Sequence, residues 1–259
     1  MNAPAPPAGA AAAIATLQAV AARALDAQRD AMTATAGIEL AHLRDLPEAS
    51  QTRALVALTL LKASCDMGLA VSTLLATSLL DLAAAALALH RTQIETYARG
   101  VFFKSAATDH DVKRFVQQDE MPKRRRANGK STTVTTAEVL RAAAEAEGMD
   151  ASKLQSMLDN VWRGLCGVVH GGRHLLHTYG AVGTIGVRFD ESSVRALLSN
   201  TGAFTVLACT TICAIGDSGA DQQEVLTRIR AAAGTITTAV DLLIPGAAIA
   251  CESELERRK

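Results

Sequence analysis

Apolar residues recur at helical spacing along most of this chain. Between positions 11 and 33, Ile14, Leu17 and Leu25 fall on one helical face, which predicts a helix. Similar runs predict further helices from about Ser50 and over residues 77–104, 109–118, 137–147, 152–170, 191–215 and 221–243. No series of alternating segments indicates a large sheet, so the expected fold class is mainly α.

Two stretches between these helices lack the spacing. Residues 121–136, MPKRRRANGKSTTVTT, combine proline, glycine and a basic cluster, which predicts a loop. Residues 179–189 hold β-branched residues and glycines, and are expected to form a small hairpin or an extended connection. We therefore expect one helical domain over 11–245, a disordered Pro/Ala leader over 1–10 and a charged tail over 246–259.

The apolar run from Met67 to His90 is long enough to cross a membrane. However, Asp81 and several hydroxyl side chains interrupt it, and much of the remainder is alanine, which gains little from lipid. These residues favour one buried helix, or two, in a soluble bundle over a membrane span. We therefore expect a cytoplasmic protein with no membrane partner.

Composition narrows the function classes further. Hydrophobic residues make up 49% of the chain and aromatic residues only 3%, which favours helices packed closely through small side chains. The formal net charge is +0, so any binding to nucleic acid must come from a local patch. The five cysteines form no C-x-x-C pair, and we expect reduced thiols in a cytosolic protein.

The segment 161–177, VWRGLCGVVHGGRHLLH, contains the only tryptophan, Trp162, and three of the six histidines. Arg163 and His170 stand about two helical turns apart and so share one face. Gly171 and Gly172 are expected to end the helix directly after them.

A helical wheel divides this helix into two faces. Leu165, Val168 and Val169 belong to the expected core face. Arg163 and His170 fall on the opposite side, which also carries the glycines at positions 164 and 167. Because glycine inside a helix costs stability, we expect another backbone or a ligand to approach this second face closely.

Plainer interpretations of this helix stay open. His170 can be a helix-end histidine favoured by the helix dipole, with Arg163 paired to Asp159 one turn back. His170, His174 and His177 also suggest a zinc site. The Gly-Gly break spoils fixed geometry and no carboxylate is near, so we expect neither a metal nor another cofactor.

A second charged group lies in the helix over 77–104. Arg91, Glu95 and Arg99 are spaced four apart and form one ladder at the edge of the apolar face. The ladder is either a buried ion-pair clamp between helices or a cluster that faces the Arg163/His170 helix and helps to bind an anion.

The loop over 121–136 carries consecutive basic residues, Lys123, Arg124, Arg125 and Arg126. Such a run can contact phosphates without reading a base sequence. A solvated loop without a ligand is the alternative.

These patterns together resemble a known superfamily. Arg163-x6-His170 at a helix end resembles the R-x4-6-H motif of the HEPN superfamily. The segment 91–115, RTQIETYARGVFFKSAATDHDVKRF, followed by WRGLCGVVHGG, resembles a family of uncharacterised bacterial proteins with a HEPN-like plan. The resemblance covers roughly residues 50–220 and implies a HEPN-like helical bundle with additional flanking helices.

The resemblance also implies an activity. Many members are metal-independent ribonucleases of toxin or antiviral defence systems that dimerise through the motif helix. His170 would then be the general acid or base and Arg163 the phosphate-stabilising group, with His174, the ladder and the basic loop contacting RNA. Active members often carry a polar residue at the position of Gly164. The alternative is a non-catalytic RNA-binding or protein-interaction module, with an antitoxin or adaptor as partner.

Overall fold

The computed structural model describes most of the chain. The described residues are 8–36, 38, 41–125, 129–148, 162, 164–172, 175, 180–181, 184–185, 191–216 and 221–241. Residues 1–7 of the predicted leader, the whole predicted tail and part of the segment 149–190 lie outside them, whereas residues 8–10 of the predicted leader are helical.

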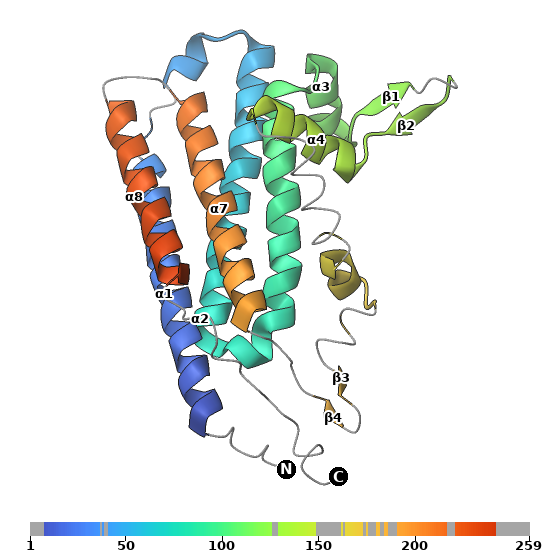
Figure 1. Cartoon of the computed structure of the whole chain (residues 1–259). Helices are drawn as coiled ribbons and strands as arrows, with labels where there is room; N and C mark the ends of the chain where they lie inside the picture. Colours follow the sequence, from blue (N-terminus) through green and yellow to red (C-terminus); the bar gives the residue numbers. More distant parts are fainter. Residues whose placement is uncertain are drawn as a thin grey trace.

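Long helices laid side by side form the body of the protein (Figure 1). The elements are α1 (Ala8–Ala36), the 3-10 helix η1 (Ala41–Asp45), α2 (Glu48–Ser105), α3 (Asp109–Gln118), β1 (Lys123–Arg125), β2 (Ser131–Thr133), α4 (Thr136–Ala146), β3 (Gly180–Ala181), β4 (Thr184–Ile185), α7 (Glu191–Ile215) and α8 (Asp221–Asp241). α7 packs against α1, α2 and α8, while α3 and α4 pack against α2. The predicted fold class, mainly α, is confirmed.

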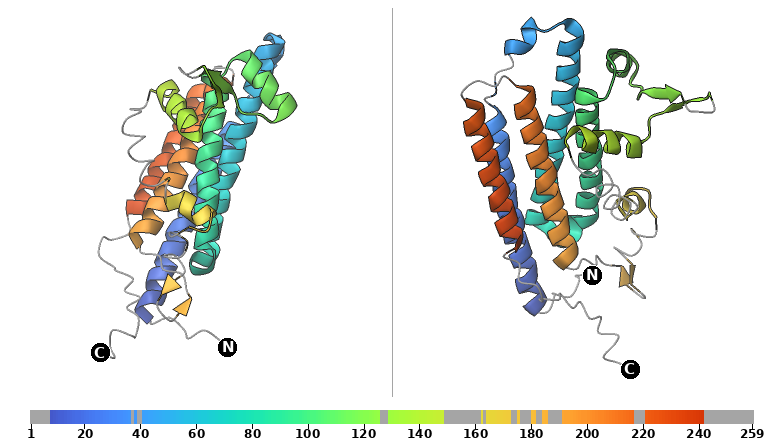
Figure 2. Two further views of the ribbon diagram at one scale, coloured as in Figure 1. Left: turned by 90° about the vertical axis from the view of Figure 1, so that its right-hand side faces the viewer. Right: turned by 45° about the horizontal axis from the view of Figure 1, so that its top comes forward.

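α2 is a helical hairpin rather than one straight helix. Ser78 has φ −152° and ψ 71°, which breaks the helix there and reverses its direction (Figure 2). The two arms then run antiparallel: Ser64 Oγ donates to the Gln93 carbonyl at 3.0 Å, and Arg53 Nη1 donates to the Phe103 carbonyl at 3.0 Å. The run from Met67 to His90 therefore forms two helical segments, one of the two arrangements expected for it.

Two helices, Glu48–Leu79 and Glu191–Ile215, are long and apolar enough to cross a membrane by length and composition. Core helices of soluble proteins meet the same criteria, so this is weak support for a span. The expected cytoplasmic location stays a prediction.

The core consists of two apolar clusters at different heights of the bundle. One is rich in aromatic side chains and includes Tyr97, Phe102, Phe103 and Phe204. The other is aliphatic and includes Leu17, Leu75, Leu79, Leu198 and Val240. Burying these side chains is the main force that holds the helices together.

Buried polar side chains lie between the two clusters and form what we call the polar layer: Gln28, Ser72, His90, Gln93, Thr201 and Thr205. Gln93 Nε2 donates to the Thr201 carbonyl at 3.0 Å and to Thr205 Oγ1 at 3.2 Å. On α7, Thr201 follows Leu198 of the aliphatic cluster and precedes Phe204 of the aromatic one. Hydrogen bonding offsets the cost of burying these groups.

Local sequence signals explain where the short helices begin. Thr108 and Asp111 form a capping box at the start of α3, and Thr135 and Glu138 form another at the start of α4. The predicted bounds of α3 and α7 are confirmed, and α4 begins one residue before its predicted start.

The prediction of an irregular loop over 121–136 was wrong for part of that segment. Lys123–Arg125 pairs antiparallel with Ser131–Thr133, and this hairpin projects from the bundle (Figure 2). The segment 179–189 contains the short antiparallel pair β3–β4, one of the two arrangements expected there.

Candidate functional site

The helix that carries His170, here called the motif helix, is described at Trp162 and over residues 164–169. Leu165 and Val168 are buried against the bundle, as predicted for the core face. His170 lies on the opposite face and is exposed, and a partner or ligand on that face stays a prediction. Val169 was wrongly placed on the core face, because its side chain is 38% exposed. The buried stripe of this helix is therefore narrower than the wheel predicted.

The motif helix ends where its glycines predicted. Gly171 has φ +69°, a conformation that favours glycine, and its N–H donates to the Val168 carbonyl at 3.4 Å. The Gly172 N–H donates to the Gly167 carbonyl at 2.6 Å, which completes a Schellman motif. A Cβ on Gly172 would lie 3.1 Å from the Gly167 Cα. The backbone that approaches Gly167 is thus the cap of its own helix, and the approach of another element or a ligand to this face stays a prediction.

Several predicted site residues lie outside the described part of the chain. These are Arg163, Arg126, His174 and His177, together with Asp159. The pairing of Arg163 with His170 on one face stays a prediction. Arg163 is flanked in sequence by Trp162 and Gly164, which are both helical.

The ladder of Arg91, Glu95 and Arg99 is confirmed. Glu95 Oε1 accepts from Arg99 Nη2 at 2.8 Å, and Glu95 Oε2 lies 3.8 Å from Arg91 Nη2. The Glu95 side chain is 17% exposed and that of Arg91 is 18% exposed, which agrees with the expected partial burial. Thr136, at the start of α4, also donates to Glu95 Oε1 at 3.4 Å. The ladder therefore connects the second arm of α2 to α4.

The ladder also meets the motif helix. The Arg91 guanidinium carbon lies 5.0 Å from the centroid of the Trp162 ring, a cation–π contact. Arg91 Nε is buried and has no hydrogen-bond partner within the described part of the chain. The expectation that the ladder faces the motif helix is thus confirmed at Trp162, whereas anion binding stays a prediction.

The predicted basic loop is held to α3 by ion pairs. Arg124 makes two bonds to Asp111, at 3.0 Å and 2.7 Å, and Lys123 lies 3.3 Å from Glu120. Burial by itself raises the pKa of Asp111, but hydrogen bonds from Arg124 and Thr108 outweigh it and lower the pKa to about 2. Lys123 and Arg124 thus have carboxylate partners inside the protein.

Arg125, at the end of β1, is exposed. Its Cα partner across the hairpin is Ser131. The Arg125 side chain is therefore accessible to a ligand.

Potential metal ligands do not converge in the described residues: no group of three or more His, Cys, Asp or Glu side chains is placed to hold an ion there. Four of the five cysteines are described, and all four are free thiols. The Cys65 and Cys209 sulfurs are 3.9 Å apart where α2 meets α7.

Sequence reasoning missed the polar layer, and His90 in particular. This side chain is 1% exposed, and its Nδ1 lies 3.0 Å from Gln93 Oε1 and 3.1 Å from Thr201 Oγ1. Burial lowers the pKa of His90 to about 4, although the hydrogen bond with Gln93 acts in the opposite direction. The available signal was their spacing, because His90 and Gln93 fall on the same helical face as the apolar residues Ile94 and Tyr97.

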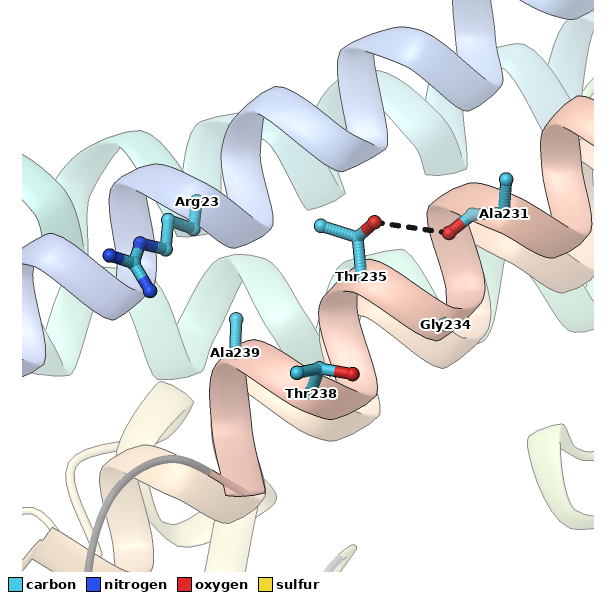
Figure 3. A pocket seen from close by; sticks show the side chains of 6 residues that line it. All are labelled: Arg23, Ala231, Gly234, Thr235, Thr238 and Ala239. Atoms are coloured by element: carbon cyan, nitrogen blue, oxygen red, sulfur yellow. Dashed lines mark hydrogen bonds between the residues drawn. The ribbon is translucent and has the colours of Figure 1, made fainter.

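A shallow pocket of about 380 Å³ lies between α1 and α8 (Figure 3). Arg23 borders it from α1, and small side chains of α8 form the remainder: Ala231, Gly234, Thr235, Thr238 and Ala239. Its lining includes no carboxylate, imidazole or thiol. It therefore offers space without acid–base groups, and none of the predicted site residues lines it.

The fold and these contacts define a helical-bundle protein with an exposed histidine at a capped helix end. Residues 61–236, most of the chain, match the profile of a family described as a family of unknown function, DUF6988. The chain belongs to that family. Searches of curated proteins and of solved structures each gave no match.

Proposed function

We propose that this protein is a HEPN-like helical bundle that cleaves RNA without a metal ion, with Arg163 and His170 as its catalytic pair. The observation that carries the proposal is the position of His170. Its imidazole is exposed at the end of a helix whose last turn is fixed by Gly171 and Gly172. Such a side chain is accessible to a large substrate, and backbone hydrogen bonds hold the turn that carries it.

The chemistry needs only groups of the protein and the RNA. His170 would take the proton of a ribose 2′-hydroxyl, whose oxygen then attacks the adjacent phosphorus. The bond from phosphorus to the 5′-oxygen breaks, and that oxygen takes up a proton. Arg163 would stabilise the negative charge that develops on the phosphate. The products are a 2′,3′-cyclic phosphate and a 5′-hydroxyl end.

Exposed cations on other elements would hold the RNA backbone. Arg99 is 37% exposed and Arg125 is exposed at the hairpin, so both are open to phosphate contact. Arg126 and His174 are proposed for the same role from the sequence alone. We further propose a cytoplasmic toxin or defence effector that acts as a homodimer through the motif helix, with an antitoxin or adaptor as partner.

The test is cleavage of single-stranded RNA by the purified protein in EDTA. We expect cleavage by the wild type and none by His170→Ala or Arg163→Ala with the helical circular-dichroism spectrum intact. His110→Ala is the matched control, because His110 is an exposed histidine on α3 and should keep full activity. Equal cleavage by the wild type and His170→Ala would contradict the proposal.

A second candidate is a non-catalytic module that binds RNA or a partner protein through the same face. The observation that favours it is the pairing of the predicted RNA-binding cations. Glu95 pairs with both Arg91 and Arg99 and offsets one of their two charges, while Lys123 and Arg124 pair with Glu120 and Asp111. Fewer free charges then remain for a polyanion.

This candidate predicts no RNA turnover and an association that depends on Gly164, which is half-buried on the motif helix. Light scattering of Gly164→Leu should show loss of the dimer. The same substitution at Gly167 is less informative, because Gly172 of the same chain packs against it. A dimer unchanged in Gly164→Leu would remove this face as the interface.

A further inference from the structure

Where the structure describes it, the motif helix packs against the bundle through apolar side chains, and the contact between Arg91 and Trp162 adds a charged group to that packing. Leu165 and Val168 bury the motif helix against the bundle, but apolar contacts alone allow a helix to rotate or slide. A guanidinium over an indole ring has a preferred geometry, since the cation sits on the face of the ring. The contact at 5.0 Å therefore restrains the motif helix more specifically than its apolar residues do.

Arg91 is itself restrained from the other side. Glu95 lies 3.8 Å from its Nη2, and Glu95 is in turn held by Arg99 at 2.8 Å and by Thr136 at 3.4 Å. A continuous series of contacts thus runs from α4 through α2 to Trp162. Trp162 directly precedes Arg163 in the sequence.

From this geometry we infer that Arg91 is a positioning residue, which fixes the motif helix, and with it His170, on the bundle through Trp162. The inference rests on the proposed function of that helix, and it assigns Arg91 to orientation rather than to phosphate binding. The planar guanidinium is essential to it, because lysine keeps the charge but cannot stack in the same way.

Trp162 makes the inference directly measurable, because the chain contains one tryptophan. In the full-length protein, Arg91→Ala should shift the tryptophan emission and raise its quenching by acrylamide. Arg91→Lys, which keeps a cation next to Glu95, should keep the fold and raise the quenching by less. Arg114→Ala is the matched control: it also removes an arginine from a carboxylate, Glu120, but it lies on α3 outside this series of contacts and no contact is described between Arg114 and Trp162, so the emission should stay unchanged.

Activity provides the second measurement. If the wild type cleaves RNA, Arg91→Ala should lower kcat on the order of 10- to 100-fold at an unchanged KM, because misplaced catalytic groups slow the chemical step. Arg91→Lys should restore part of the rate. If Arg91→Ala mainly raises KM and leaves kcat unchanged, Arg91 binds phosphate, and the positioning role is overturned.

The two proposals fail in different ways. If both Arg91 variants show the same tryptophan emission and acrylamide quenching as the wild type, the inference is overturned, whatever their activity. A changed emission with an unchanged kcat would also overturn it, because His170 would then be positioned without Arg91. A wild type that never cleaves RNA would refute the ribonuclease proposal, and the fluorescence alone would then decide whether Arg91 fixes the motif helix.

Discussion

The buried histidine of the polar layer should make this protein sensitive to acid. Gln93 uses its amide nitrogen for Thr201 and Thr205, so its Oε1 is left to accept from His90 Nδ1. That arrangement places the proton of the neutral imidazole on Nδ1. His90 Nε2 is buried and has no hydrogen-bond partner within the described part of the chain. A second proton on Nε2 would therefore lie in an apolar environment without an acceptor.

The magnitude follows from the two pKa values of His90. The pKa is 6.5 in the unfolded chain and about 4 in the folded one. Between pH 6.5 and about pH 4, His90 is protonated in the unfolded chain but neutral in the folded protein, so the free energy of unfolding decreases as the pH is lowered. Linkage gives a loss of about 2 kcal/mol by pH 5 and about 3 kcal/mol by pH 4, relative to neutral pH. The full stability is present above pH 6.5.

The assay is urea unfolding followed by circular dichroism at a series of pH values from 7.5 to 4. His90→Asn is the comparison, because its Nδ2 can still donate to Gln93 but the side chain does not titrate. The variant should be less stable at pH 7.5, owing to the smaller side chain, and the difference from wild type should shrink by about 3 kcal/mol at pH 4. Carboxylates titrate in both proteins and cancel in the difference. A difference that stays constant with pH would refute the reasoning.

Four further substitutions test other contacts. In a denaturant titration, Gly68→Ala should lower the free energy of unfolding by about 1–3 kcal/mol, because its Cβ would overlap side chains of the polar layer. Gly234→Ala should raise that free energy by up to about 1 kcal/mol, because nothing lies within 4 Å of the new Cβ. Arg124→Ala removes the guanidinium that pairs with Asp111, so amide hydrogen exchange should accelerate in β1–β2 but not in α7. If the amides of β1–β2 are protected equally in the variant and the wild type, the ion pair does not hold the hairpin. Gly171→Ala should cost about 1 kcal/mol through its φ of +69°, and an unchanged Tm would contradict the cap.

The sequence predicted well those features that depend on local signals. The bounds of α3 and α7 agree with the structure because helical spacing and capping residues such as Thr108 act within a few positions. The ladder of Arg91, Glu95 and Arg99 was predictable for the same reason, since residues four apart on a helix are neighbours whatever the fold.

Features that depend on distant contacts were not predictable in this way. The spacing predicted a new helix from about residue 77, but it did not show that the chain reverses at Ser78, because this residue is neither glycine nor proline and both arms of α2 bury a helical face. His90 belongs to the core only because Thr201 and Thr205 on α7 complete its surroundings. The β1–β2 hairpin is short and exposed, and Arg124 reaches Asp111 on α3, which periodicity cannot show.

The reversal at Ser78 also orders the steps of folding. Its two arms meet across short loops, as in the contact of Ser64 with Gln93, which spans 29 positions, whereas Cys65 meets Cys209 across 144. Closing the longer loop costs about 1.4 kcal/mol more in chain entropy, and local contacts speed folding. We therefore expect the α2 hairpin to form first and α7 to dock on it later. Pulsed hydrogen exchange during refolding should show amides of α2 protected before those of α7.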